Sequence, residues 1–124
     1  MIAADTSSLI AFFAGEDGRD VELVRSALSG SQICLPPVVI VELLSDAKTR
    51  DALEEVILDW PVLHPTDGHW NRAGASRSKL IAKALAPKVR DTLIAQSCID
   101  HDVALITRDG DFRHFAKHCG LRLA

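Results

Sequence analysis

The chain has 124 residues, of which 48% are hydrophobic and 5% aromatic, and its formal net charge is −3 at pH 7. This length suits one globular domain with a single core, and no apolar run approaches the roughly 18–20 residues of a membrane-spanning helix. The N-terminus lacks the basic segment of a signal peptide, so we expect a cytoplasmic protein with no membrane partner. Three cysteines in apolar surroundings favour buried thiols over a disulfide framework.

Short apolar segments alternate with helical patterns along the whole chain. We expect strands at residues 2–5, 32–35, 61–64 and 103–107, with 121–123 as a candidate last strand. We expect helices at residues 6–14, 19–29, 36–47, 49–59, 67–85, 91–101 and 111–118. This alternation predicts a parallel sheet covered on both faces, and ligands of such sheets bind outside the carboxyl ends of the strands.

Four acidic residues stand at the ends of predicted elements or interrupt them. Asp5 ends the first strand, Glu42 lies within an apolar helix, Asp91 opens the helix D-T-L-I-A-Q-S, and Asp109 follows the last clear strand. Three of these positions have an equally good structural explanation, because Asp caps helices and D-G marks turns. Isolated carboxylates beside a core are costly unless they are paired or bind a metal.

Glu42 is the acid that structure alone explains least. Residues 38–41 before it and residues 43–44 after it are all apolar, so we expect a helix that is buried or nearly so. A Glu there needs a cation or a proton, which favours a functional role over a structural salt bridge. Two carboxylates ~4 Å apart repel by ~4 kcal/mol at an effective dielectric near 20, so a cluster needs a compensating charge. Oxygen ligands favour Mg²⁺ or Mn²⁺ over zinc.

A basic segment adjoins Asp91. Residues 68–90 contain no Asp or Glu and six basic residues, which are Arg72, Arg77, Lys79, Lys83, Lys88 and Arg90. The segment carries +6, so the rest of the chain carries −9. A metal-dependent enzyme that acts on a polyanion needs such a neighbour, and a solvated helix face is the alternative of equal weight.

Four sequence segments together resemble the PIN domain, with the closest similarity to the VapC-type toxins of bacterial toxin–antitoxin modules. They are the strand-ending D-T-S, P-P-V-V-I-V-E-L, R-D-T-L-I-A-Q-S-C and L-I-T-R-D-G-D-F. The resemblance covers essentially the whole chain and implies one PIN-like nuclease domain at residues 1–124. The implied fold is a three-layer α/β/α sandwich around a short, mostly parallel sheet. Ser7 departs from the Asn of many relatives, yet no expected acid is missing.

The resemblance also implies an activity and its residues. The chain would be an endoribonuclease that uses Mg²⁺ or Mn²⁺ and hydrolyses RNA to leave a 5′-phosphate, with one or two metal ions left open. The catalytic residues would be Asp5, Glu42, Asp91 and Asp109; the metal ligands Asp5, Asp91 and Asp109, with Asp111 as a second candidate. Thr6, Ser7 and Thr107 would support the acids by hydrogen bonds, and Lys79, Lys83, Lys88 and Arg90 would bind RNA.

The partners implied by the resemblance are RNA, a small VapB-like antitoxin and a second copy of the chain. In this family the antitoxin commonly inserts a basic side chain among the acids. Crowded apolar residues in the first helix suit a dimer seam or a groove for an amphipathic antitoxin helix. They are Leu9, Ile10, Phe12 and Phe13.

Two alternatives use the acids differently. A phosphoacceptor signalling domain would place acids and Mg²⁺ at the same sheet edge, but it would need a Lys after a late strand, where this chain has Thr107 and Arg108. A non-catalytic interaction module would use the acids only as caps and salt bridges. Metal titration distinguishes the interaction module, which would bind no Mg²⁺ or Mn²⁺, from a nuclease. RNA cleavage distinguishes the nuclease from the signalling domain.

Overall fold

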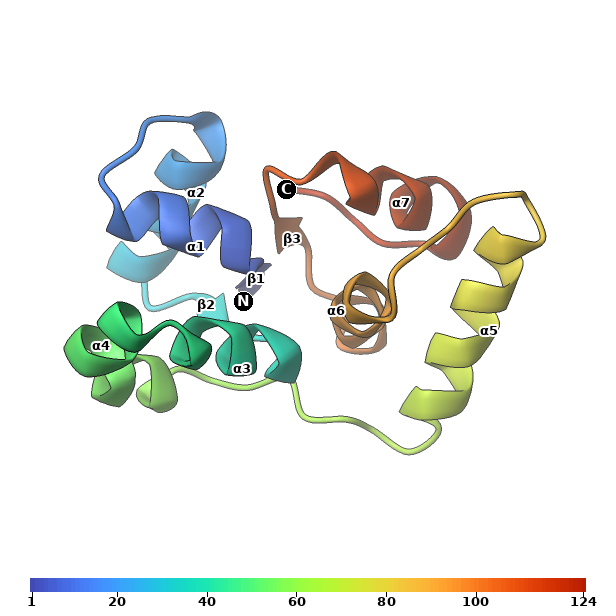
Figure 1. The fold of residues 1–124 in the computed structure, drawn as a ribbon, viewed down its shortest axis with the longest axis horizontal. Helices are drawn as coiled ribbons and strands as arrows, with labels where there is room; N and C mark the ends of the chain where they lie inside the picture. The colour runs from blue at the N-terminus through green and yellow to red at the C-terminus, as the bar shows by residue number, and fades with distance from the viewer.

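The computed structural model describes residues 1–124, and its strands and helices alternate in the predicted order (Figure 1). The strands are β1 (Ile2–Ala4), β2 (Ile33–Cys34) and β3 (Leu105–Ile106). The helices are α1 (Thr6–Phe13), α2 (Arg19–Ser29), α3 (Pro37–Ser45), α4 (Ala47–Asp59), α5 (His69–Ile81), α6 (Val89–Asp100) and α7 (Arg113–Cys119), with a 3-10 turn η1 (Gly110–Phe112) before α7. None of these helices has the length and apolar character that crossing a bilayer demands.

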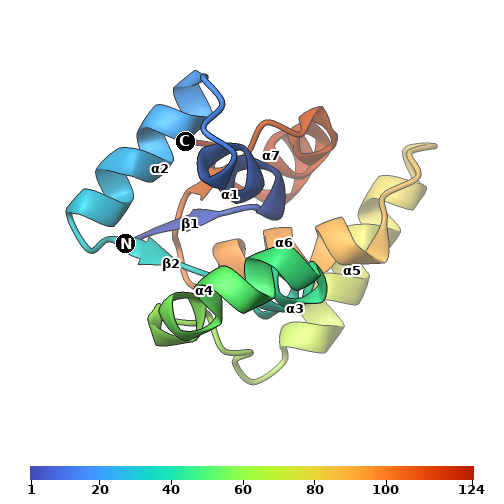
Figure 2. The same ribbon diagram turned by 60° about the vertical axis from the view of Figure 1, so that its left-hand side comes forward.

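The three strands form a parallel sheet in the order β2-β1-β3. The register pairs Ala3 with Cys34 on one side and with Leu105 on the other. Helices α1 and α2 lie on one face of the sheet and α3, α4 and α6 on the other, while α5 packs outside α6 (Figures 1 and 2). The predicted three-layer architecture with a short parallel sheet is therefore confirmed.

Two predicted strands are wrong as strands, because each contributes a single bridge. Val62 pairs with Leu35, and Leu123 pairs with Leu105. The Pro61 ring leaves no backbone N–H for a ladder, so only its carbonyl takes part, accepting from the Leu35 N–H at 2.9 Å.

Helix α5 is shorter than the predicted 67–85. It starts after Gly68, which has a left-handed φ of 82°, and it ends before Ala84, which has a φ of 60°. A non-glycine residue in that conformation cannot continue a right-handed helix. The residues between α5 and α6 therefore form a loop instead of further helical turns.

The core lies on both faces of the sheet and is built from aliphatic side chains with two phenylalanines, Phe112 and Phe115. The cysteines are free thiols; Cys34 and Cys98 are buried, and Cys119 is partly exposed. Burial raises the pKa of both buried thiols, which therefore remain protonated at neutral pH.

Candidate functional site

The predicted acids gather at the carboxyl edge of the sheet. Asp5 follows β1 and Asp109 follows the neighbouring strand β3, so the two ends meet at this edge. The first turn of α6 brings Asp91 to the same edge. Both loop acids also cap the element that follows: Asp5 accepts from the Thr6 N–H at 2.8 Å, and Asp109 from the Asp111 N–H at 2.9 Å. Capping fixes their carboxylates in place.

Asp5 is fully buried and its carboxylate is saturated with hydrogen bonds. Oδ1 accepts from the Thr6 N–H and from Arg90 Nη2 at 3.0 Å. Oδ2 accepts from the Ser7 hydroxyl at 3.0 Å and from the Thr107 hydroxyl at 3.1 Å. Four donors occupy both oxygens, so the Asp5 carboxylate is held in one orientation.

The third hydroxyl expected to support the acids also contacts one of them: Thr6 Oγ1 donates to Glu42 at 2.7 Å. Thr107 Oγ1, which donates to Asp5, also accepts from the Asp109 N–H at 3.0 Å. Thr107 thus links the acid after β1 to the acid after β3.

Arg90 lies among the acids, whereas the sequence suggested that it would contact RNA at the surface. Its three guanidinium nitrogens each pair with a different carboxylate: Nε with Glu42, Nη1 with Asp91 and Nη2 with Asp5. Burial alone would lower the pKa of Arg90, but the hydrogen bond to Glu42 and the charges of Asp5 and Glu42 outweigh it and raise that pKa. In this arrangement the guanidinium acts as an internal counter-ion and is not free for a phosphate.

A second set of carboxylates has the spacing of metal ligands. Oxygens of Asp91, Asp109 and Asp111 lie within 4.8 Å of one another. Arg90 pairs with Asp91 but with neither Asp109 nor Asp111, so this set has uncommitted oxygens. Three carboxylates with free oxygens suit a hard divalent cation. The predicted metal ligand Asp5 is not a member of this set, and its own oxygens already accept four hydrogen bonds.

Asp91 belongs to both sets and is the most perturbed acid of the site. Burial raises its pKa; the hydrogen bond from Arg90 lowers it, and the charges of Asp109 and Asp5 add to the increase. The net direction is upward, so the ionised form of Asp91 is destabilised without a metal. A nearby cation would relieve this destabilisation.

The expectation of a buried helix around Glu42 is wrong. Only Val39 and Leu43 of α3 are buried, whereas Val41 is 66% exposed and the Glu42 side chain 29% exposed. The helix packs on the core with one face only: Val38, Ile40 and Leu44 are partly buried there, and Val41 faces solvent. Glu42 is stabilised by a hydrogen bond from Thr6 and by a salt bridge to Arg90. A structural salt bridge was the less favoured interpretation of Glu42 from the sequence.

The basic segment divides into engaged arginines and free lysines. Arg72 pairs with Asp100, and Arg77 Nε donates to the Pro87 carbonyl at 3.0 Å. No carboxylate lies within ion-pair distance of Lys79, Lys83 or Lys88, which remain available for RNA phosphates. The RNA role of the three lysines stays a prediction.

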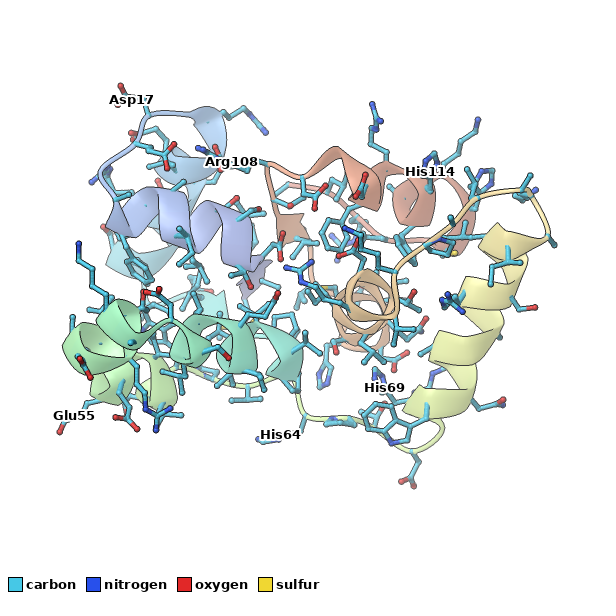
Figure 3. The ribbon with its side chains drawn as sticks, viewed as in Figure 1. Asp17, Glu55, His64, His69, Arg108 and His114 are labelled. Atoms are coloured by element: carbon cyan, nitrogen blue, oxygen red, sulfur yellow. The ribbon has the colours of Figure 1, made fainter.

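The arginine that follows β3 serves a different group of acids. Arg108, labelled in Figure 3, donates to Asp20 in the first turn of α2 at 2.8 Å and to Glu16 in the loop before α2 at 3.2 Å. It therefore does not offer its charge to the acid cluster, as the Lys of a phosphoacceptor domain would.

Comparison with known proteins identifies the family. The model of the PIN domain matches residues 2–118. The chain belongs to the PIN domain family. A comparison with curated proteins finds no match.

The fold is also found in a solved structure of this family. One chain in the crystal structure of VapBC2 from Rickettsia felis bound to a DNA fragment from their promoter is similar, with a TM-score of 0.77 and 18% identity. The similarity covers 100% of this chain and 98% of the other. At this identity it shows the PIN fold alone.

Sequence reasoning missed the place of Arg90. The available signal was the R-D dipeptide at the start of a helix that carries a buried acid, since a neighbour one residue away can reach the same cluster. Sequence reasoning also missed a small cavity beside Asp91 and Asp111, because its lining comes from three helices and a loop.

Proposed function

We propose that this PIN domain is an endoribonuclease that depends on Mg²⁺ or Mn²⁺, and that it is the toxin of a toxin–antitoxin pair. The observation that carries the proposal is the set Asp91, Asp109 and Asp111, with carboxylate oxygens within 4.8 Å of one another. Family membership supports it, since PIN domains are generally nucleases. We assign the whole chain, residues 1–124, to the nuclease domain.

The residues of the edge divide the work of the reaction. Asp91, Asp109 and Asp111 would hold the metal, which would supply a polarised phosphate oxygen and a bound water of lowered pKa. Asp5 and Glu42 would keep the neighbouring side chains in place through the threonine hydroxyls and Arg90. The free lysines would hold phosphates of the substrate on either side. Water attack on phosphorus would release the 3′ oxygen and leave a 5′-phosphate.

The toxin assignment has a second support in the apolar surface between α1 and α4. Ile10, Phe13 and Leu53 line a hollow of about 370 Å³ there, and Ile10 is partly exposed. An amphipathic helix of a VapB-like antitoxin fits such a surface. We further infer a homodimer that acts in the cytoplasm, in keeping with the VapC resemblance.

The nuclease is tested with purified protein and a single-stranded RNA. We expect cleavage with Mn²⁺ or Mg²⁺, none with a chelator, and products that a 5′-phosphate-dependent exonuclease degrades. Absence of cleavage, together with no metal binding in calorimetry, would leave the interaction module as the better explanation. Metal binding without cleavage would favour the signalling domain.

The toxin role is tested separately by expression with and without the neighbouring small open reading frame. We expect growth arrest from the nuclease alone, relief by the neighbour, and a complex of the two in a pull-down. If the neighbour neither binds nor relieves arrest, the toxin role is wrong while the nuclease stands.

A further inference from the structure

A small cavity opens beside the metal-spaced acids, between α5, the loop at residues 82–88 and α7. The loop crosses from the end of α5 toward α6 below α7 (Figure 1). Buried Leu80 and Phe115 form its floor, and Leu85, Ala86 and Pro87 line it from the loop. Its volume is about 150 Å³. An apolar cavity of about this size accepts a benzene-sized ring.

The polar part of the lining connects the cavity to the candidate active site. Asp91 and Asp111, two of the three metal-spaced acids, lie at the cavity. Lys88 and His114 complete the lining, and His114 projects from α7 (Figure 3). A group held in this cavity is therefore next to the position at which a phosphate would meet the acids.

The loop that forms the cavity is held in place from both sides. Arg77 Nε donates to the Pro87 carbonyl at 3.0 Å, and Thr92 Oγ1 donates to the Lys88 carbonyl at 2.8 Å. Ala84, at the start of the loop, adopts a left-handed φ of 60°, a conformation that turns the chain out of the helix. Such a fixed loop gives a preformed cavity, as small-ligand sites usually have.

Basic residues lie at and near the cavity. Lys88 and His114 line it, and α5, which carries Lys79, contacts α7, which carries Lys117 and His118. A ligand with an apolar ring and flanking phosphates matches this combination of apolar floor and basic surroundings.

We propose that the cavity holds one unpaired pyrimidine base of the substrate RNA, directly beside the bond that is cleaved. The inference rests on the proposed nuclease function and names the part of the substrate that the site selects. The volume is close to what a single six-membered ring needs, so the smaller pyrimidine suits the cavity better than the fused rings of a purine, and a base pair cannot enter. The protein therefore selects single-stranded RNA with a pyrimidine at one position.

Direct binding is tested with cytidine 5′-monophosphate and adenosine 5′-monophosphate in the presence of Mg²⁺. We expect the cytidine nucleotide to shift the methyl NMR signals of Leu80 and Leu85, and the adenosine nucleotide to bind at least about tenfold more weakly. Ala86→Phe fills the cavity from an exposed position and should abolish the shifts. Ala82→Phe is the matched control, because Ala82 is exposed on the same loop but is not part of the lining.

Cleavage gives an independent readout. With RNAs that carry one pyrimidine in a purine background, the wild type and Ala82→Phe should cut at the pyrimidine at least about tenfold faster than elsewhere, and Ala86→Phe should lose this preference. A purine preference, unmoved Leu80 and Leu85 signals, or an unchanged preference in Ala86→Phe overturns the proposal.

The outcomes also separate this proposal from the proposed function. Nucleotide shifts in the cavity without cleavage of any RNA would leave the cavity as a nucleotide site and remove the nuclease. Cleavage without a base preference would do the reverse. If Ala86→Phe fails to fold, Leu85→Ala enlarges the cavity, and binding of the adenosine nucleotide should then rise several-fold; no gain would overturn the size argument.

Discussion

Two clusters of charged residues, one at each end of α6, differ in the ratio of hydrogen-bond donors to carboxylates. In one, Arg72 and other donors surround the single carboxylate of Asp100. In the other, the single guanidinium of Arg90 is shared among three carboxylates, with Asp109 and Asp111 nearby. Because both clusters include an aspartate of α6, the main difference between them is the balance of charge.

The Asp100 cluster has more donors than its carboxylate needs. Arg72 Nε and Nη2 each donate at 2.9 Å, Gln96 Nε2 donates at 2.8 Å, and His69 Nδ1 lies 2.9 Å away. Burial alone would raise the pKa of Asp100, but the hydrogen bonds from Arg72, Gln96 and His69 outweigh it and hold that pKa well below its usual range. This cluster is complete without any ligand and joins α5 to α6.

The Arg90 cluster has fewer positive charges than its carboxylates need. Five acids lie at this edge with one guanidinium, which pairs with three of them, and the pKa of Asp91 is raised where that of Asp100 is lowered. Surplus negative charge that is partly buried is unfavourable for folding and favourable for binding a cation. The difference teaches that a saturated carboxylate marks structure, while carboxylates in excess of donors mark a binding site.

The largest expected effect is on cleavage, and it compares the two buried aspartates of α6. Asp91→Asn should lower the rate about a thousandfold, because a metal contributes several kcal/mol and each 1.36 kcal/mol is tenfold. Its metal-free stability should be unchanged or higher, since the raised pKa shows that burial disfavours the charge. Asp100→Asn should keep its rate per folded molecule. Single-turnover cleavage with thermal melting measures both, and wild-type activity in Asp91→Asn would remove Asp91 from the site.

Substitutions of Asp91 and Asp100 should also have opposite effects on the free energy of unfolding. Asp100→Asn should lower the free energy of unfolding by about 2 kcal/mol and the melting temperature by roughly 6–8 °C, because it removes the charged acceptor of the hydrogen bonds from Arg72, Gln96 and His69. The pKa of Asp100 is lowered, so its contribution is complete above the ordinary carboxyl pKa near 4 and is lost as the pH falls through the folded pKa. The difference between wild type and variant should therefore shrink in acid. Melting curves from pH 7 to pH 2 test this, and a constant difference would contradict it.

The sequence predicted the fold well because the signals are local. Apolar periodicity and the following glycine predicted the bounds of α2 correctly at 19–29. The alternation of strands and helices predicted the parallel sheet. The failures came from tertiary context. Periodicity could not show that α3 covers the sheet with one face only, nor that Ala84 would end α5 early.

The acids were found from the sequence, but their division into two sets was not. That Asp5 and Asp109 would lie at one edge follows from strand order alone. The position of Arg90 depends on how α3, α6 and the end of β1 approach one another, so the R-D dipeptide signals a neighbour of Asp91 but not the contacts with Asp5 and Glu42. The sequence of a basic segment also does not show which side chains pair with an acid of the same protein, as Arg72 does, and which do not, such as Lys79.

A smaller effect separates the two arginines by metal affinity. Arg90→Met should bind Mn²⁺ about tenfold more tightly than wild type, because a competing cation next to Asp91 is gone, a gain of about 1.4 kcal/mol. Its metal-free melting temperature should fall. Arg72→Met should also melt lower but should bind Mn²⁺ as the wild type does. Calorimetric titration measures the affinities, and weaker binding by Arg90→Met would mean that Arg90 organises the acids for the metal.

The smallest effect concerns the basic segment itself, which contains both free lysines and engaged arginines. Neutralising Lys79, Lys83 and Lys88 together should flatten the salt dependence of RNA binding by about 2 in logarithmic slope, since each phosphate contact on a single strand contributes about 0.7. Arg72→Gln should leave the slope unchanged, because its guanidinium already pairs with Asp100. Fluorescence anisotropy with the inactive Asp91→Asn background and several KCl concentrations gives the slopes without cleavage. Equal slopes for the triple variant and its parent would make the lysines a solvated face, whereas a change in the Arg72→Gln slope would show that the Asp100 cluster opens when RNA binds.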